Sequence, residues 1–194
     1  PETAARWRKE APPDFVFSVL CEPLVTQSHF RRTREVEAAW EKTLAVAGAL
    51  EAGFIVFETP GTFYPQADHL RDLYAFVRAA NRSGAVLAWQ PSKGWEPDLL
   101  RRVCRDLRLV HAVDPLAQAP VAGAVHYFRL RGGGPGRKPS RGHLYTDAEL
   151  RQVIELARGK PTYAYFQTAD MWDDAQKLAA FGKPVFADAV REVI

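Results

Sequence analysis

Polar residues stand at the ends of several short apolar runs in this sequence, and their types suit acid–base and anion chemistry. Glu58 and Asp114 each follow such a run, where a carboxylate can serve as a general base. Arg129 and Arg131 close another run, and a guanidinium group forks onto carboxylate or phosphate oxygens. We count the amides and the hydroxyl at the other run ends as ligand-binding candidates: Gln90, Gln167 and Thr168. Together these residues predict a site for a small anionic ligand.

The apolar runs predict β-strands, because they are short and rich in β-branched and aromatic residues. Six of them occur along the chain: 15–20, 54–58, 85–89, 109–113, 124–130 and 162–166. Amphipathic segments with apolar residues at three- and four-residue steps predict helices between most of the runs: 34–52, 67–81, 96–107, 146–158 and 171–181. Thr146 and Glu149 have the spacing of a capping box at the start of one of these helices.

The alternation of strands and helices predicts an α/β fold with a parallel sheet, because parallel neighbours need crossover connections. An open doubly wound sheet and a closed barrel both fit this pattern. No GxGxxG or GxxxxGK[ST] motif follows any of the runs, so the phosphate cradle of a nucleotide-binding open sheet is missing. In a barrel, the carboxyl ends of the strands meet at one mouth, and the polar run-end residues would face it.

Length and composition are those of a globular protein with one core. The chain has 194 residues, of which 47% are hydrophobic, so we expect a single barrel domain over residues 1–194. The apolar runs are far shorter than the ~20 residues of a membrane span, so we expect a cytoplasmic protein without a membrane partner. A net charge of +3 is compatible with anionic partners but too small to indicate a dedicated nucleic-acid-binding protein.

Metal and thiol chemistry have little support in the sequence. Cys21 and Cys104 lie in apolar surroundings without CxxC spacing, which predicts reduced core thiols rather than a disulfide or zinc ligands. The five histidines show no HxH or HExxH spacing, and the alternation of side chains along a strand directs His111 toward the helices. We therefore expect no metal site and no cofactor.

Seven stretches of the chain resemble the YecE-like family, also called domain of unknown function 72, in their order and spacing. They are ETAARWRKEAPPDFVFSVLCEPLVTQ, VFETPGTFYP, LAWQPSKGW, VHAVDP, YFRLRG, LYTDAEL and YAYFQTADMWDDAQKL. The chain looks most similar to the archaeal branch of that family. The resemblance implies a TIM-barrel-like fold whose first strand and helix would lie before Pro1, so that about six strands are visible here. It implies no activity, because the family is named for lacking one.

The resemblance adds Tyr145 to the ligand-binding candidates, because the family pattern retains this residue. Other family positions differ: Leu20 replaces a lysine, Glu58 replaces a glutamine and Arg131 replaces a histidine. Loss of several titratable groups together predicts a divergent relative that binds without turnover. The alternative is that Glu58 and Arg131 restore charge at new positions, and both alternatives stay open.

A basic, glycine-rich loop follows the run that contains Arg129. It spans residues 132–142 and includes Arg137, Lys138 and Arg141. Beside an anion-binding mouth such a loop predicts a mobile lid. The alternative is an exposed insertion without a function.

Three functions fit these observations. The first is a barrel that binds a small anionic ligand, such as a phosphorylated one, and that hydrolyses it if Asp114 or Glu58 acts as a base. The second is a nucleic-acid-binding or nucleic-acid-processing protein, whose affinity would fall steeply with salt. The third is an inactive paralogue with a structural or regulatory role, in which an oligomer or a partner chain completes the barrel.

Overall fold

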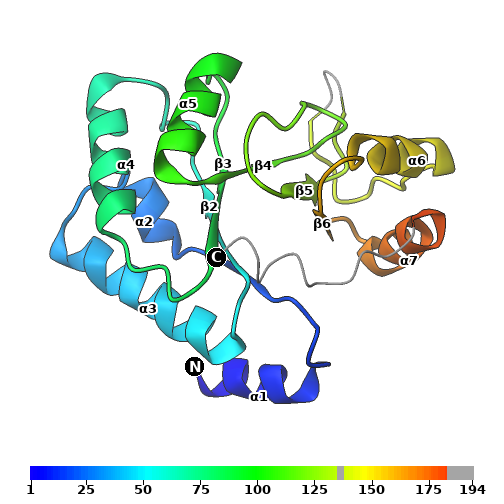
Figure 1. Ribbon diagram of the computed structural model, residues 1–194, viewed down its shortest axis with the longest axis horizontal. Coiled ribbons are helices and arrows are strands. Elements are labelled where there is room, and N and C mark those ends of the chain that lie inside the picture. The colour runs from blue at the N-terminus through cyan, green and yellow to red at the C-terminus, as the bar shows by residue number, and fades with distance from the viewer. Residues whose placement is uncertain (135–137, 183–194) are drawn as a thin grey trace. The chain divides into compact units, whose positions relative to one another are not determined.

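The computed structural model describes residues 1–134 and 138–182. The described chain divides into two compact units, one up to Leu109 and one from Val110 onward. Helices and strands alternate along most of the chain, except that α3 follows α2 and β5 follows β4 directly (Figure 1). Within the described ranges, no helix is both long enough and apolar enough to cross a membrane.

The first unit contains a sheet of three parallel strands. These are β1 (Ser18–Leu20), β2 (Phe54–Glu58) and β3 (Val86–Gln90), with β2 paired to both neighbours. All of β2 except Glu58 is buried, as expected for a central parallel strand that is covered on both faces. The strand predicted over 15–20 begins later, at Ser18, because Phe15 N–H donates to Pro12 O in a turn at 3.0 Å.

Five helices belong to the first unit: α1 (Glu2–Glu10), α2 (Pro23–Gln27), α3 (Arg34–Leu50), α4 (Ala67–Ala79) and α5 (Pro97–Leu107). An aromatic cluster joins α3 and α4 to the sheet. The ring of Phe57 on β2 lies 5.3 Å from Phe30, 5.7 Å from Trp40 of α3 and 6.1 Å from Phe76 of α4. Since side chains alternate along a strand, Phe57 faces the helices while Val56 and Glu58 point to the opposite face.

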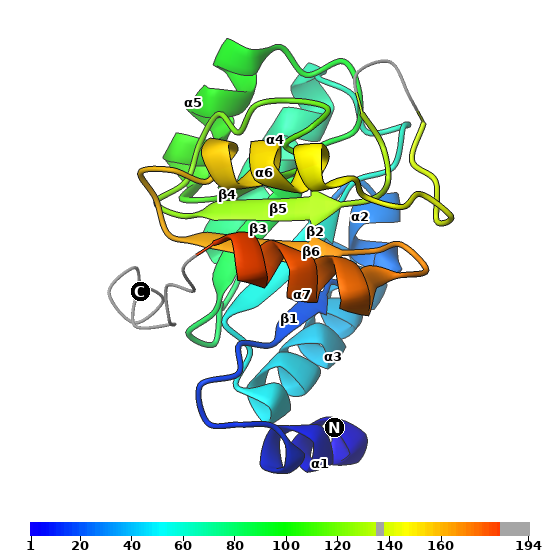
Figure 2. The same cartoon turned by 90° about the vertical axis from the view of Figure 1, so that its right-hand side faces the viewer.

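The second unit also contains three parallel strands. They are β4 (Val110–Val113), β5 (His126–Leu130) and β6 (Thr162–Phe166), with β5 in the middle. Helices α6 (Asp147–Leu156) and α7 (Met171–Phe181) lie side by side along one face of this sheet (Figure 2). Phe128 and Leu130 of β5 pack there against Leu150 and Val153 of α6.

Strand order agrees with the predicted fold class. In each unit the parallel strands follow one another in chain order, and helices make most of the connections. A doubly wound sheet would instead reverse its strand order at a switch point. The fold is therefore α/β and TIM-barrel-like.

The two cysteines and the histidine of β4 are buried in the core. Cys21 and Cys104 are free and buried, and burial raises the pKa of each thiol to about 12, which confirms the prediction of reduced core thiols. His111 is 1% exposed, and its Nδ1 atom accepts a hydrogen bond from Val121 N–H at 3.2 Å. This bond secures the link between β4 and β5.

Candidate functional site

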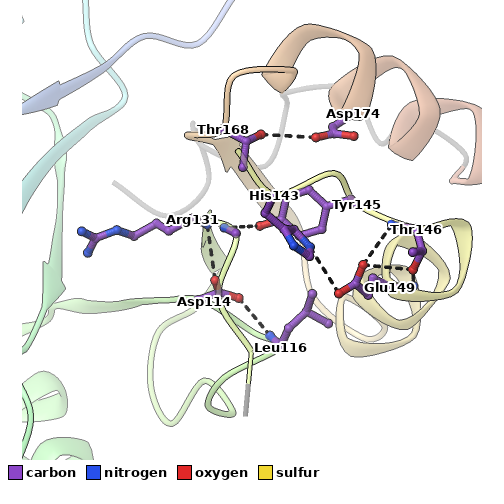
Figure 3. A network of polar contacts seen from close by, with 10 residues as sticks. Asp114, Leu116, Arg131, His143, Tyr145, Thr146, Glu149, Thr168 and Asp174 are labelled. Atoms are coloured by element: carbon purple, nitrogen blue, oxygen red, sulfur yellow. Dashed lines mark hydrogen bonds and ion pairs between the residues drawn. The ribbon is translucent and has the colours of Figure 1, made fainter. Parts of the chain in front are cut away.

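The carboxylate of Asp114 joins the ends of two strands in the second unit (Figure 3). Asp114 directly follows β4, and its Oδ2 atom accepts a hydrogen bond at 3.3 Å from the N–H of Arg131, which follows β5. Its Oδ1 atom accepts another from Leu116 N–H at 3.1 Å. Burial raises the pKa of Asp114, against the opposing effects of the Arg131, Leu116 and Gly133 N–H groups and the Arg131 charge. Asp114 thus has the raised pKa that suits a general base, but it also holds the loop after β5.

The two arginines of β5 and its end differ in exposure. Phe128 and Leu130 face α6 and α7, so Arg129, between them, points to the opposite face of the sheet. Arg129 is 3% exposed, whereas Arg131 is only half-buried. Both have interaction partners. In Figure 3 the Arg131 guanidinium points away from the Asp114 carboxylate. Since Arg131 is less buried than Arg129, it is the more accessible of the two arginines.

The Tyr145 hydroxyl group accepts a hydrogen bond from the backbone of the loop after β5. Gly132 N–H donates to the Tyr145 hydroxyl oxygen at 2.7 Å. Gly132 has a φ of +71°, and a Cβ atom there would collide with the Ser140 carbonyl oxygen and lie 2.6 Å from His143 Cβ. Glycine is required at this position because both the backbone angle and the space exclude a side chain. Burial raises the pKa of the Tyr145 hydroxyl, and the charges of nearby carboxylates raise it further.

His143 is a member of this network that the sequence did not reveal. Its Nε2 atom lies 3.3 Å from Glu149 Oε1, close enough for an electrostatic contact, although the geometry is not that of a hydrogen bond. Its ring meets the Tyr145 ring edge to face, with centroids 4.6 Å apart. The other Glu149 oxygen closes the predicted capping box of α6 by accepting from Thr146 N–H at 2.9 Å. The capping-box spacing identified Glu149, but only the folded loop brings His143 to it.

Gln167 and Thr168 follow β6. Gln167 N–H extends the β5–β6 ladder by donating to Leu130 O at 2.8 Å. The Thr168 hydroxyl donates to Asp174 Oδ2 at 3.2 Å, and Asp174 is 1% exposed at the start of α7 (Figure 3). Burial raises the pKa of Asp174, and the Thr168 hydrogen bond opposes that effect. Thr168 therefore stabilises the buried carboxylate of Asp174. Like His143, Asp174 was not among the site residues predicted from the sequence.

The basic loop is bonded to the ends of two strands over its described part. Ser140 N–H donates to Arg131 O at 3.1 Å, and Ala169 N–H, after β6, donates to Arg141 O at 2.7 Å. Lys138 and Arg141 are exposed. Arg137, the third cationic residue expected in this loop, lies outside the described residues. The stretch from Ser140 to Tyr145 is thus fastened at several points, as a fixed edge of the site would be.

Glu58 and Gln90 belong to the first unit. They end β2 and β3, are direct partners in the parallel register, and lie on the sheet face opposite Phe57. Glu58 also lines a cavity of about 370 Å³ at the carboxyl ends of β1 and β2, called the β1–β2 pocket below. Its walls are residues 20–23, 26, 27 and 58–60.

Of the predicted site residues, Asp114, Arg131 and Tyr145 form one connected network at the strand ends of the second unit. Thr168 stands beside it in a pair with Asp174, and Glu58 and Gln90 form a pair of neighbours in the first unit. In the ranges that the structure describes, no group of three or more His, Cys, Asp or Glu residues is arranged to hold a metal ion.

Comparison with known proteins identifies a family and a fold. The family model described as protein of unknown function DUF72 matches residues 1–185. A DUF72 family protein from Enterococcus faecalis is similar in structure, with a TM-score of 0.71 and 13% identity over 96% of this chain and 81% of that one. A DUF72 family protein from Thermotoga maritima has a TM-score of 0.67 and 18% identity over 93% of this chain and 77% of that one. No curated protein matches the sequence.

Proposed function

The chain belongs to DUF72, a family of proteins of unknown function, and from the geometry of its site we propose that it binds a small anionic ligand at the carboxyl ends of β4, β5 and β6. One observation carries the proposal. The basic loop is bonded to Arg131 after β5 and to Ala169 after β6, which gathers exposed cationic side chains at the edge where TIM-like barrels bind ligands.

The cations have side chains suited to oxyanions. The guanidinium groups of Arg131 and Arg141 can each offer a forked pair of N–H donors to a phosphate or carboxylate. Lys138 adds a third positive charge from the same loop. Gln167 is a neutral donor after β6, so the edge combines charge with a group that could orient a ligand.

For turnover of such a ligand we assign the base to Asp114. Burial raises its pKa, which makes Asp114 a stronger proton acceptor than an ordinary carboxylate, and an ionised carboxylate has about four lone-pair sites, of which backbone N–H groups use only some. Glu58 remains the alternative base. An unreactive site that only binds the ligand is the outcome expected for an inactive relative.

A thermal-shift titration tests the binding proposal. Phosphate and sugar phosphates are the probes, with Arg131→Gln and Arg141→Gln as variants and Arg108→Gln, an exposed residue of the other unit, as matched control. Ligand at a hundred times its dissociation constant stabilises a fold by ~2.7 kcal/mol, which a melting curve resolves. We expect stabilisation of the wild type and of Arg108→Gln, and a weaker effect in both site variants.

Two results would contradict this proposal and favour one of the other two functions. A shift with oligonucleotides alone, with affinity falling steeply as salt rises, would favour the nucleic-acid function. No shift with any anion would favour the structural or regulatory relative. Arg129→Ala is unsuitable as a variant, because removing a buried guanidinium side chain also threatens the fold.

A second proposal concerns a partner chain, and the edge of β6 supports it. Pro161 O accepts from His126 N–H, and Gln167 N–H donates to Leu130 O, so odd-numbered residues of this segment bond to β5. In a parallel ladder the even-numbered residues, Thr162, Ala164 and Phe166, then direct their N–H and C=O groups to the opposite edge. All five residues of β6 are half-exposed and uncharged. Charge and proline are the usual protection of an exposed edge, and we propose that this edge accepts a β-strand from another chain.

A further inference from the structure

The β1–β2 pocket lies wholly in the first unit and has the size of a small-molecule site, since such sites span ~300–1,000 Å³. We propose that it binds a small organic cation, an alkylammonium or alkylguanidinium ion. This inference is independent of the anion site proposed for the second unit, and it rests on the composition, hydrogen bonding and rigidity of the pocket walls.

Charge on the walls is negative. Glu22, after β1, and Glu58, at the end of β2, are the acidic side chains of the walls, and the described walls include no Lys, Arg or His. Glu58 has another interaction as well, but a carboxylate can accept about four hydrogen bonds, so a ligand does not need Glu58 to be free. Glu22 is exposed and supplies an accessible charge on the β1 side.

Hydrogen-bond donors on the walls are already in use. The Thr59 hydroxyl donates to Gln90 O at 3.2 Å, and the Thr26 hydroxyl donates to Pro23 O at 3.3 Å. What these walls mainly offer is therefore acceptors, with the Gln27 amide as the exception. A complementary ligand has to bring N–H donors and positive charge, which an ammonium or guanidinium group supplies.

The remaining walls are apolar and are held in place. Leu20 is 55% exposed, and with Pro23 and Pro60 it offers apolar surface for a short alkyl chain. The backbone beside it is fixed, because Cys21 N–H donates to Val56 O at 2.9 Å and Glu22 N–H donates to the Thr43 hydroxyl of α3 at 3.1 Å. A pocket that is formed before binding avoids the entropic cost of ordering its walls.

Amide chemical-shift mapping of the whole chain tests the inference. The probes are butylamine and butylguanidine, with 1-butanol and butyrate as neutral and anionic controls of the same chain length. We expect the cations to give saturable shifts at Leu20–Glu22 and at Glu58 and Thr59. The control compounds should give no shifts at these residues. Glu22→Gln should weaken the cations about fivefold, the effect of losing one exposed charge pair.

Leu20→Lys is the sharpest variant, because it places an ammonium group in the pocket and should abolish cation binding. Leu20→Met has similar length without the charge and should bind like the wild type. Arg131→Gln should also bind the amines normally, while weakening phosphate, which separates this site from the anion site. Equal binding of 1-butanol, or unchanged amine affinity in both Glu22→Gln and Leu20→Lys, would overturn the inference.

Discussion

The carboxylate of Asp114 occupies backbone N–H groups that an external anion would otherwise bind. The N–H groups of Arg131 and Gly133 both hydrogen-bond to it, and that of Gly132, between them, goes to Tyr145. Neighbouring backbone N–H groups of this kind form an anion-binding site called a nest, and here the anion bound in the nest is the carboxylate of Asp114. At the scale of single residues, the proposed ligand must therefore be held by side chains, chiefly those of Arg131 and Arg141.

Gly132→Ala should destabilise the protein by about 2–3 kcal/mol. The new Cβ atom would meet the Ser140 carbonyl, and the φ of +71° adds backbone strain. Gly142→Ala is the matched control in the same loop, because nothing lies within 4 Å of its added Cβ atom and its φ is not in the left-handed range. Urea unfolding measures both, and equal stability of the two variants would show that the loop yields easily.

Stability should fall in mild acid because of His111. Burial lowers its pKa from 6.5 to about 4, so the unfolded chain takes up the proton first as the pH falls. The contribution of His111 is complete above about pH 6.5 and is lost progressively toward pH 4, by about 3 kcal/mol in all. His111→Asn can accept the Val121 N–H bond without titrating. The difference in unfolding free energy between wild type and variant should therefore change between pH 7 and pH 4.5, and a constant difference would contradict the assignment.

At the scale of elements, one helix start connects the loop to the α6–α7 layer. Glu149 uses one oxygen for the capping box of α6 and the other for His143, whose ring packs on Tyr145. Tyr145 in turn accepts the Gly132 N–H at the end of β5. The start of α6 and the loop after β5 are thus joined through three side chains.

Thr146→Ala should cost about 1 kcal/mol, because it removes the side-chain cap from the first turn of α6. Glu149→Gln keeps a side chain that can close a capping box but loses the charge beside His143, so we expect a smaller loss. Chemical denaturation compares the two. A larger effect of Glu149→Gln would mean that the pair with His143, rather than the cap, dominates at this helix start.

At the scale of the whole molecule, the proposed partner strand can be tested at the edge of β6. Because the Ala164 N–H is directed away from β5, Ala164→Pro leaves the β5–β6 ladder intact while blocking the opposite edge. If another chain adds a strand there, native mass spectrometry should show an assembly for the wild type and a monomer for Ala164→Pro. Tyr165→Pro is the control for ladder damage and should unfold the unit. A wild type that is monomeric at all concentrations, and that binds no partner, would refute the proposal of a partner strand.

Periodicity and motif spacing predicted most of the elements, because these are local properties of the chain. The strands over 54–58 and 162–166 and the helix over 171–181 have the predicted bounds, and the capping box of Thr146 and Glu149 is present. The sequence missed α2, whose five residues are too few to show a helical period. The family resemblance is confirmed by the match over residues 1–185.

The sequence by itself determined the fold class, the strand ends and the residue types that stand there, because hydrophobic period and turn chemistry act over a few residues. Only the tertiary structure decided which of those residues meet. Arg131 N–H donates to Asp114 only because the parallel pairing of β4 and β5 brings their ends together. His143 reaches Glu149 only because the loop returns to the strand ends. Burial also depends on distant segments that cover a side chain, so no local pattern predicts it. It makes Arg129 inaccessible while Arg131 stays half-buried, and it raises the pKa of Asp114.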